Sequence, residues 1–207
     1  KYNLVMIVDE TMTGMGRTGT FLSIQQYDVE PDIIIMGKAL GVYCPISATI
    51  ITEKIAGAFQ DNIFGHGQSF SGHALACKAA IESIKVLEED LLPNIADKSK
   101  YLFNKLNELK QEFDFVGEVR GIGLMWTMEL VKDSATKESY RTFGEKYKKT
   151  PIKILADYLL NEKNIYMPGD KFGVWIVPPL VVSFEELDWL VKQLRDGLSF
   201  FKKEFID

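Results

Sequence analysis

The sequence predicts an α/β fold whose first part contains a mostly parallel sheet with one antiparallel strand. Two short apolar runs, LVMIV at 4–8 and IIIM at 33–36, have the composition of strands covered on both faces. The stretch between them, which includes FLSIQQYDVEP, is long enough for the crossover that parallel strands need. A third run, ISATIIT at 46–52, follows after a short turn and therefore predicts an antiparallel strand.

Helical periodicity replaces the strand pattern from about Ser71. SGHALACKAAIESIKVLEED repeats apolar residues at the i, i+3 and i+4 spacing of a helix. IADKSKYLFNKLNELKQEF continues helically after Pro93, with charged residues on its outer face. We therefore expect an α/β domain over residues 1–95 and a small C-terminal α+β domain over residues 96–207.

The second domain has its own sequence of strands and helices. VGEVRGIGLMWTMELV at 116–131 alternates and contains glycines, which predicts a hairpin or meander. TPIKILADYLLNEK predicts a helix with Pro151 in its first turn. VWIVPPLVVS predicts a strand that ends at the Pro-Pro pair. The closing stretch SFEELDWLVKQLRDGLSFFKKEF predicts a helix that begins at a capping box formed by Ser183 and Glu186.

Composition and charge exclude several classes of function. The chain of 207 residues has a net charge of −5 with both signs interspersed, so we expect no nucleic-acid partner. Cys44 and Cys77 lie far apart, which gives no basis for a disulfide framework or a zinc site. No signal peptide or membrane-spanning run is apparent, so we expect a soluble cytoplasmic protein. Because KYNLVMIVDE enters a strand pattern within its first residues, we also expect the chain to be part of a longer protein.

The loop DETMTGMGRTG at 9–19 contains the G-x-G-x-x-G spacing of a dinucleotide-binding fingerprint. That interpretation requires an acidic residue at the end of the second strand, to accept hydrogen bonds from the ribose hydroxyls. Lys38 follows this strand instead, and an ammonium group cannot accept a hydrogen bond. Two acidic residues, Asp9 and Glu10, also separate the first strand from the glycines. We therefore reject NAD binding.

Asp9 and Lys38 follow neighbouring parallel strands, so both should lie at the same edge of the sheet. A plain ion pair is the simplest interpretation. The alternative is a site for pyridoxal phosphate (PLP), in which a lysine forms a Schiff base with the cofactor aldehyde and a carboxylate keeps the pyridine nitrogen protonated. Neighbouring strand ends can present these two groups to opposite ends of one ring.

The same residues carry a family resemblance. DETMTGMGRTGTF, EPDIIIMGKALG and HGQSFSGHALACKAAI, in this order, resemble the class III (ω) aminotransferases of PLP fold type I. The chain looks most like the branch that transfers amino groups from amines, taurine or β-alanine to pyruvate. The resemblance continues through VRGIGLMWTMELVKD and PPLVVSFEELD. It implies the C-terminal half of a subunit, in which residues 1–95 complete the PLP-binding large domain and residues 96–207 form the small domain.

The resemblance also implies roles for individual residues. Asp9 would pair with the pyridinium nitrogen, and Lys38 would carry the Schiff base. Ser69 falls where the family usually has a threonine that reaches the cofactor phosphate of the neighbouring subunit, which implies a homodimer or larger assembly; a helix N-cap is the alternative role. Met12 stands where many relatives place a glutamine that bonds to the cofactor's ring hydroxyl, and a thioether is a weak acceptor.

One negative feature bears on the substrate. Many relatives bind a substrate carboxylate through an arginine shortly before the Pro-Pro pair, but this sequence has no arginine between Arg141 and Arg195. Trp175 precedes the prolines, and Lys163 and Lys171 are the nearby positive charges. We therefore favour an amine or ω-amino acid as amino donor and a keto acid, pyruvate, as acceptor.

Three functions stay open at this point. The first is an aminotransferase that acts through a Lys38 Schiff base. The second is a PLP aminomutase on the same fold, which moves the amino group within one substrate. The third is a non-catalytic fragment or oligomerisation module, in which Asp9 and Lys38 form only an ion pair.

Overall fold

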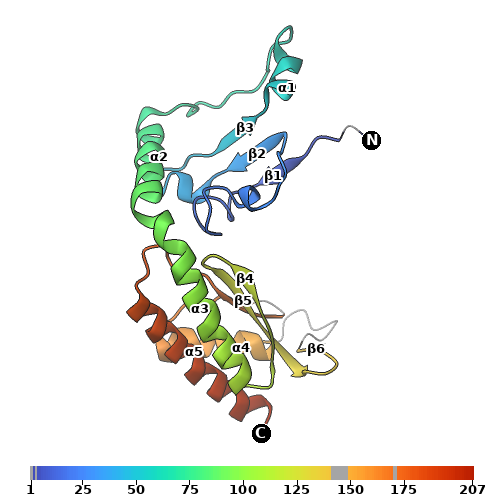
Figure 1. Cartoon of the computed structure of the whole chain (residues 1–207), viewed down its shortest axis with the longest axis vertical. Coiled ribbons are helices and arrows are strands. Elements are labelled where there is room, and N and C mark those ends of the chain that lie inside the picture. The colour runs from blue at the N-terminus through green and yellow to red at the C-terminus, as the bar shows by residue number, and fades with distance from the viewer. Residues whose placement is uncertain (1, 3, 141–148, 170–171) are drawn as a thin grey trace. The chain divides into compact units, whose positions relative to one another are not determined.

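The computed structural model divides into two compact units, Lys1–Ile95 and Ala96–Asp207. The structure describes residues 2, 4–140, 149–169 and 172–207 (Figure 1). The first unit contains a three-stranded sheet, and the second contains a four-stranded sheet with helices of its own. The expected α/β class is confirmed: the first sheet is mixed, and the second is antiparallel.

The first sheet has the order β1-β2-β3. Its strands are β1 (Ile7–Asp9), β2 (Ile33–Met36) and β3 (Ala48–Ile51). β1 pairs with β2 in parallel and β3 pairs with β2 antiparallel, as the apolar runs and connection lengths predicted. β1 is shorter than the apolar run that predicted it, because β2 pairs with this run only over its last residues.

The helices of the first unit differ from the prediction at two points. Those that follow β3 are α1 (Glu53–Ala56), η3 (Gly57–Phe59), α2 (Ala74–Val86), the short π-helix η4 (Leu87–Leu91) and α3 (Leu92–Glu112), which continues into the second unit. α2 begins at Ala74 with His73 as N-cap, three residues later than predicted. α2 runs through η4 into α3 without a break, although Pro93 lacks the N–H that a helix uses. A π-turn directly before the proline is a known way to accommodate such a residue.

The second sheet is antiparallel and built around β5 (Met125–Asp133). β4 (Val116–Ile122) forms the predicted hairpin with β5, while β6 (Glu138–Ser139) and β7 (Gly173–Ile176) also pair with β5. β7 is the strand that was predicted before the Pro-Pro pair.

Two further helices complete the second unit, and both begin as predicted. α4 (Pro151–Lys163) has Thr150 as N-cap, whose side chain accepts a hydrogen bond from the Lys153 N–H at 3.2 Å. α5 (Phe184–Phe205) starts at the capping box: the Ser183 hydroxyl accepts from the Glu186 N–H, and the Glu186 carboxylate accepts from the Ser183 N–H. The two helices contact each other, and the core includes the fully buried side chains of Leu106, Met128, Leu155, Leu159, Leu194 and Phe201.

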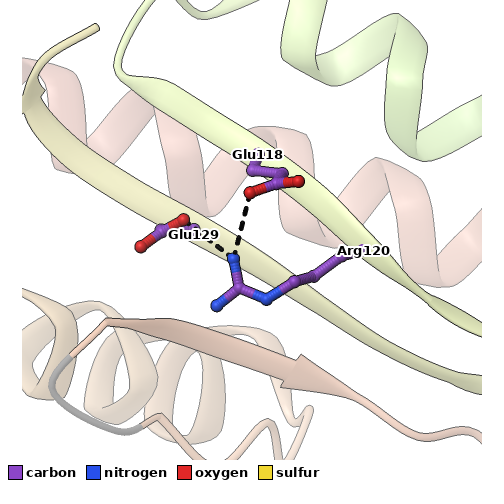
Figure 2. Close-up of polar contacts among 3 residues, drawn as sticks. All are labelled: Glu118, Arg120 and Glu129. Atoms are coloured by element: carbon purple, nitrogen blue, oxygen red, sulfur yellow. Dashed lines mark hydrogen bonds and ion pairs between the residues drawn. The ribbon is translucent and has the colours of Figure 1, made fainter. Parts of the chain in front are cut away.

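An exposed ion-pair group lies on the hairpin of the second unit (Figure 2). Glu118 in β4 stands directly opposite Glu129 in β5. Nη1 of Arg120 lies 3.3 Å from Oε2 of Glu118 and 2.9 Å from Oε2 of Glu129. Like charges directly opposite each other destabilise a sheet, so the guanidinium offsets their repulsion. The hydrogen bond to Glu129 is the main cause of the raised pKa of Arg120.

The described residues contain neither a membrane-spanning helix nor a cluster of metal-binding side chains. No helix within residues 4–140, 149–169 and 172–207 is both long enough and apolar enough to cross a membrane. Over the same ranges, no group of three or more His, Cys, Asp or Glu side chains is arranged to hold a metal ion.

Candidate active site

Asp9 and Lys38 lie at the same edge of the first sheet. Asp9 is the last residue of β1 and pairs with Ile35 of β2. The N–H of Glu10 donates to the carbonyl of Ile35 at 2.8 Å, which extends the pairing by one residue. Lys38 follows the end of β2 by two residues. The parallel pair therefore brings a carboxylate and an amine together at its carboxyl end.

The backbone of Lys38 is strained. Its φ angle is +46°, in the left-handed region that residues other than glycine rarely adopt. Lys38 begins a short 3₁₀ turn, η2 (Lys38–Leu40), and the N–H of Gly41 donates back to its carbonyl at 3.3 Å. A side chain at Gly41 would collide with the carbonyl oxygen of Cys44, 2.0 Å from the position of a Cβ. This tight turn holds the lysine in its unusual conformation, as occurs at many active sites.

Thr11 connects the two predicted residues. Its N–H donates to Oδ1 of Asp9 at 3.0 Å. Nζ of Lys38 donates to Oγ1 of Thr11 at 3.4 Å. Among the ion pairs of the described residues, none joins Asp9 directly to Lys38. The threonine was missed by the sequence reasoning, which considered only the strand ends.

The hydrogen bonds from Thr11 stabilise the ionised form of Asp9. The backbone N–H of Thr11 and then its side chain are the largest causes that lower the pKa of Asp9 below its ordinary value. The positive charge of Lys38 lowers the pKa further, while burial opposes these effects. An aspartate is ionised at neutral pH even at its ordinary pKa, and these contacts favour that state further, as a carboxylate that holds a proton on a ring nitrogen requires.

The glycine-rich loop is fixed by the buried carboxylate of Glu10. Its Oε1 accepts from the N–H of Ile24 at 2.8 Å, and its Oε2 accepts from the hydroxyl of Thr13. Gly14 allows the chain to pass closely, because a Cβ there would lie 2.8 Å from the Glu10 carbonyl oxygen. The element that follows is η1 (Ser23–Gln26), a 3₁₀ turn of four residues, rather than the α-helix that a dinucleotide fingerprint requires. The geometry agrees with the rejection of NAD binding.

A cavity of about 740 Å³ opens beside Lys38. Its wall also includes Pro45, Ile46, Ser47, Phe70 and His73. This volume lies in the range of small-molecule and cofactor sites. Asp9, Met12 and Ser69 are not among the lining residues.

The structure places the remaining predicted residues, Ser69 and Met12, at exposed positions. Ser69 lies in the turn that precedes α2, and its side chain is exposed. The N-cap of α2 is His73, so the N-cap alternative for Ser69 is wrong. The physical reason is the turn through Gly72, whose φ of +66° delays the helix. Met12, in the loop after β1, is 50 % exposed.

The residues before the Pro-Pro pair offer little positive charge. Trp175 lies in β7 and is 37 % exposed. Nζ of Lys163 binds Oδ2 of Asp196 at 2.8 Å, so this ammonium group already has a carboxylate partner. Lys171 lies outside the described residues.

The groups at the sheet edge fit PLP. An exposed lysine amine at a cavity can reach the cofactor aldehyde, and an ionised aspartate at the neighbouring strand end can bind a protonated ring nitrogen. The hydroxyl between them adds a hydrogen-bonding group that can serve either side chain.

Comparison with known proteins agrees with this fit. The model of the family described as aminotransferase class-III matches residues 1–198. The acetylornithine aminotransferase of Methanocaldococcus jannaschii is 36% identical over 203 residues, which cover 97% of this chain and 46% of that protein. An (S)-enantioselective ω-transaminase from Thermomicrobium roseum matches with a TM-score of 0.84 and 36% identity, over 97% of this chain and 44% of that one.

A third similar protein is known with its cofactor. The taurine:2-oxoglutarate aminotransferase from Bifidobacterium kashiwanohense, in complex with PLP and glutamate, matches with a TM-score of 0.90 and 27% identity. The match covers 98% of this chain and 45% of that one. The chain therefore belongs to the class III aminotransferase family, a family of PLP enzymes. It spans less than half the length of the relatives that it matches.

Proposed function

We propose that the protein containing this chain is a PLP-dependent aminotransferase that moves an amino group from an amine or ω-amino acid to pyruvate. The proposal rests on the positions of Asp9 and Lys38 at one edge of the first sheet. Both residues bind Thr11, and Lys38 lines a cavity of about 740 Å³. In this proposal residues 1–95 belong to the cofactor-binding domain and residues 96–207 form the small domain.

The two side chains have complementary tasks. PLP, when bound, supplies an electron sink for the carbanion that forms when the substrate loses a proton. Nζ of Lys38 would hold the cofactor at its aldehyde and, as a free amine, would move the substrate proton as the general base. Asp9 would bind the ring nitrogen in its protonated form, and the hydrogen bonds from Thr11 favour the ionised carboxylate that this requires.

Ser69 and Met12 complete the proposed cofactor contacts. The resemblance to the family supports a contact from Ser69 to the cofactor phosphate in the site of a partner subunit. The Ser69 side chain is exposed and does not line the cavity beside Lys38, so it is free to reach such a partner. The active protein is then a homodimer or a larger assembly. The thioether of Met12 gives the ring hydroxyl at most a weak contact.

The residues before the Pro-Pro pair support the choice of pyruvate. A dicarboxylate needs a second cationic group, best supplied by the paired N–H donors of an arginine. Trp175 provides no charge, and Lys163 is already paired with Asp196. The taurine aminotransferase described above is named for the acceptor 2-oxoglutarate, a dicarboxylate, and the proposal for this chain differs from it in that respect.

The aminomutase is the main competing proposal, because it would use the same lysine and aspartate. The non-catalytic module is less well supported, since Asp9 and Lys38 contact Thr11 instead of each other.

Formation of alanine from pyruvate tests the proposal. The PLP-loaded protein that contains this chain should convert pyruvate to alanine with an amine or ω-amino acid donor, whereas an aminomutase would form an isomer of the donor and no alanine. Lys38→Ala should abolish alanine formation. The matched control, Lys85→Ala, changes an exposed lysine of the same unit and should leave the rate unchanged. Alanine formation that survives Lys38→Ala would contradict the proposal.

A further inference from the structure

Ser83 is a polar residue on the buried face of α2. The buried residues of this face are Ala76 and Ala80, and Leu87 continues it into η4. Ser83 lies three residues after Ala80 and four before Leu87, the spacings that place side chains on one side of a helix. It is itself half-buried. A hydroxyl on a face that packs inward needs a hydrogen-bond partner, because a polar group that leaves water unpaired costs free energy.

The partner of Ser83 lies in the turn that carries Lys38. Oγ of Ser83 donates to the carbonyl of Ala39 at 3.0 Å, across 44 positions of the chain. A serine within a helix commonly bonds to the carbonyl four residues earlier in the same helix, as Ser199 does with Arg195 at 3.0 Å. Ser83 instead joins α2 to η2, and these two elements contact each other.

The turn of η2 needs external support because its backbone is strained. Lys38 and Val42 both have positive φ angles, +46° and +54°. Residues other than glycine hold this conformation only where surrounding contacts fix it. The bond inside the turn, from the N–H of Gly41 to the carbonyl of Lys38, is long at 3.3 Å. The bond from Ser83 to the carbonyl of Ala39 is shorter, and it attaches the turn to a helix.

The same helix forms part of the wall of the cavity beside Lys38. Ala76 and Cys77, in the first turn of α2, line this cavity together with the lysine. Ser83 lies about two turns further along α2 and binds the carbonyl of Ala39, the residue directly after Lys38. One helix therefore carries part of the cavity wall and also locates the backbone from which the lysine side chain starts.

We propose that Ser83 is a positioning residue: its hydroxyl, through the carbonyl of Ala39, fixes the turn that presents Lys38 to the cavity. The inference rests on the proposed function, because it concerns the same lysine. Ser83 touches neither cofactor nor substrate and acts only through the backbone of η2. Without this bond the strained turn loses an external contact, and the amine is held less well in the position from which it reaches the cofactor aldehyde.

The test compares Ser83→Ala with Ser83→Thr by two measurements on the protein that contains this chain. Hydrogen exchange is followed in the peptide that contains the amides of Leu40 and Gly41, which are bonded within the turn. The affinity of PLP for Lys38 is measured from the fraction of this lysine that is labelled after borohydride reduction, over a series of PLP concentrations. Ser83→Ala should exchange faster at the turn and bind PLP about fivefold more weakly, the effect of one ordinary hydrogen bond. Ser83→Thr keeps the hydroxyl and should retain both properties.

The matched control is Ser199→Ala, which removes a serine hydroxyl with an equally short bond to a carbonyl, but within α5 of the second unit. It should leave both the exchange of the turn and the affinity for PLP unchanged. Equal PLP affinity of Ser83→Ala and the unsubstituted protein would overturn the inference, as would weaker binding without faster exchange, or an equal loss in Ser83→Thr. If the unsubstituted protein forms no adduct on Lys38, the proposed function itself fails, whatever the exchange of the turn shows.

Discussion

Asp9 and Lys38 reach one edge of the first sheet from parallel strands, and the contact between them runs through Thr11. The N–H of Thr11 lies 3.0 Å from the carboxylate of Asp9, and its Oγ1 lies 3.4 Å from Nζ of Lys38. These contacts favour the ionised carboxylate, and Lys38 is among the residues that line a cavity. An ionised carboxylate and a nearby amine are the two groups that PLP chemistry requires.

Replacement of Asp9 by asparagine should separate cofactor attachment from catalysis. The amide cannot hold the ring nitrogen protonated, so we expect amino transfer in Asp9→Asn to slow by about a hundredfold or more, while Lys38 still anchors PLP. Single-turnover measurement of the first half-reaction gives this rate. Asp28→Asn, which changes an exposed carboxylate of the same unit, is the control and should retain the full rate. Equal rates for the two variants would refute a role for Asp9.

The Asp133 turn predicts a specific dependence of stability on pH. The hydrogen bonds from Thr136, and then that from the N–H of Ala135, lower the pKa of Asp133 in the folded state. Because the folded pKa lies below the unfolded one, this stabilisation is present above the unfolded pKa of about 3.9 and disappears as pH falls through the folded pKa. Asp133→Asn should therefore lower the melting temperature at pH 7 and have no effect at the lowest pH. If the melting temperatures of Asp133→Asn and the unsubstituted protein differ by the same amount at every pH, this linkage is contradicted.

The Glu118 and Glu129 pair should become a source of repulsion when its cation is removed. Arg120→Met leaves two carboxylates opposite each other, and we expect a loss of roughly 1 kcal/mol in the free energy of unfolding, the upper range for exposed ion pairs. Denaturant unfolding at low and high salt measures this loss of stability. The loss should be smaller at high salt, because salt screens the repulsion between the two carboxylates. Addition of Glu118→Gln should recover part of the stability. If the double variant is as unstable as the single one, repulsion is not the cause.

The capping box of α5 should make a measurable contribution of its own. Ser183→Ala removes the hydroxyl that accepts from the Glu186 N–H at 3.1 Å, and should cost about 1 kcal/mol of the free energy of unfolding. Ser183→Asn, which keeps a side-chain acceptor, is the matched variant and should cost less. Denaturant unfolding compares the two. An equal loss in both would show that the hydrogen bond is not responsible.

The strand ends of the site could be predicted from the sequence because their signals are local. The β-branched runs around 4–8 and 33–36 predict strands, and the connection between them is long enough for the parallel pairing that brings Asp9 and Lys38 to one edge. The expectation that the first strand is covered on both faces is wrong, because Ile7 is 58 % exposed. The capping box at Ser183 was equally predictable, since both partners lie within four residues.

The role of Thr11 and the start of α2 could not be predicted in the same way. Threonine is common in turns, and its contact with Lys38 depends on a loop conformation that the buried Glu10 fixes through tertiary hydrogen bonds. The Ser-Gly beginning of the helical pattern favoured an earlier start, but the positive φ of Gly72 makes His73 the N-cap. The π-turn before Pro93 likewise leaves no local signature that periodicity could reveal.

Chemical trapping of the cofactor on one lysine tests the central claim most directly. The protein that contains this chain is mixed with PLP and reduced with borohydride, and the labelled peptide is identified by mass spectrometry. The account predicts a single pyridoxyl adduct on Lys38, which is lost in Lys38→Ala. A label distributed over exposed lysines such as Lys54 and Lys85, or no label at all, would contradict it.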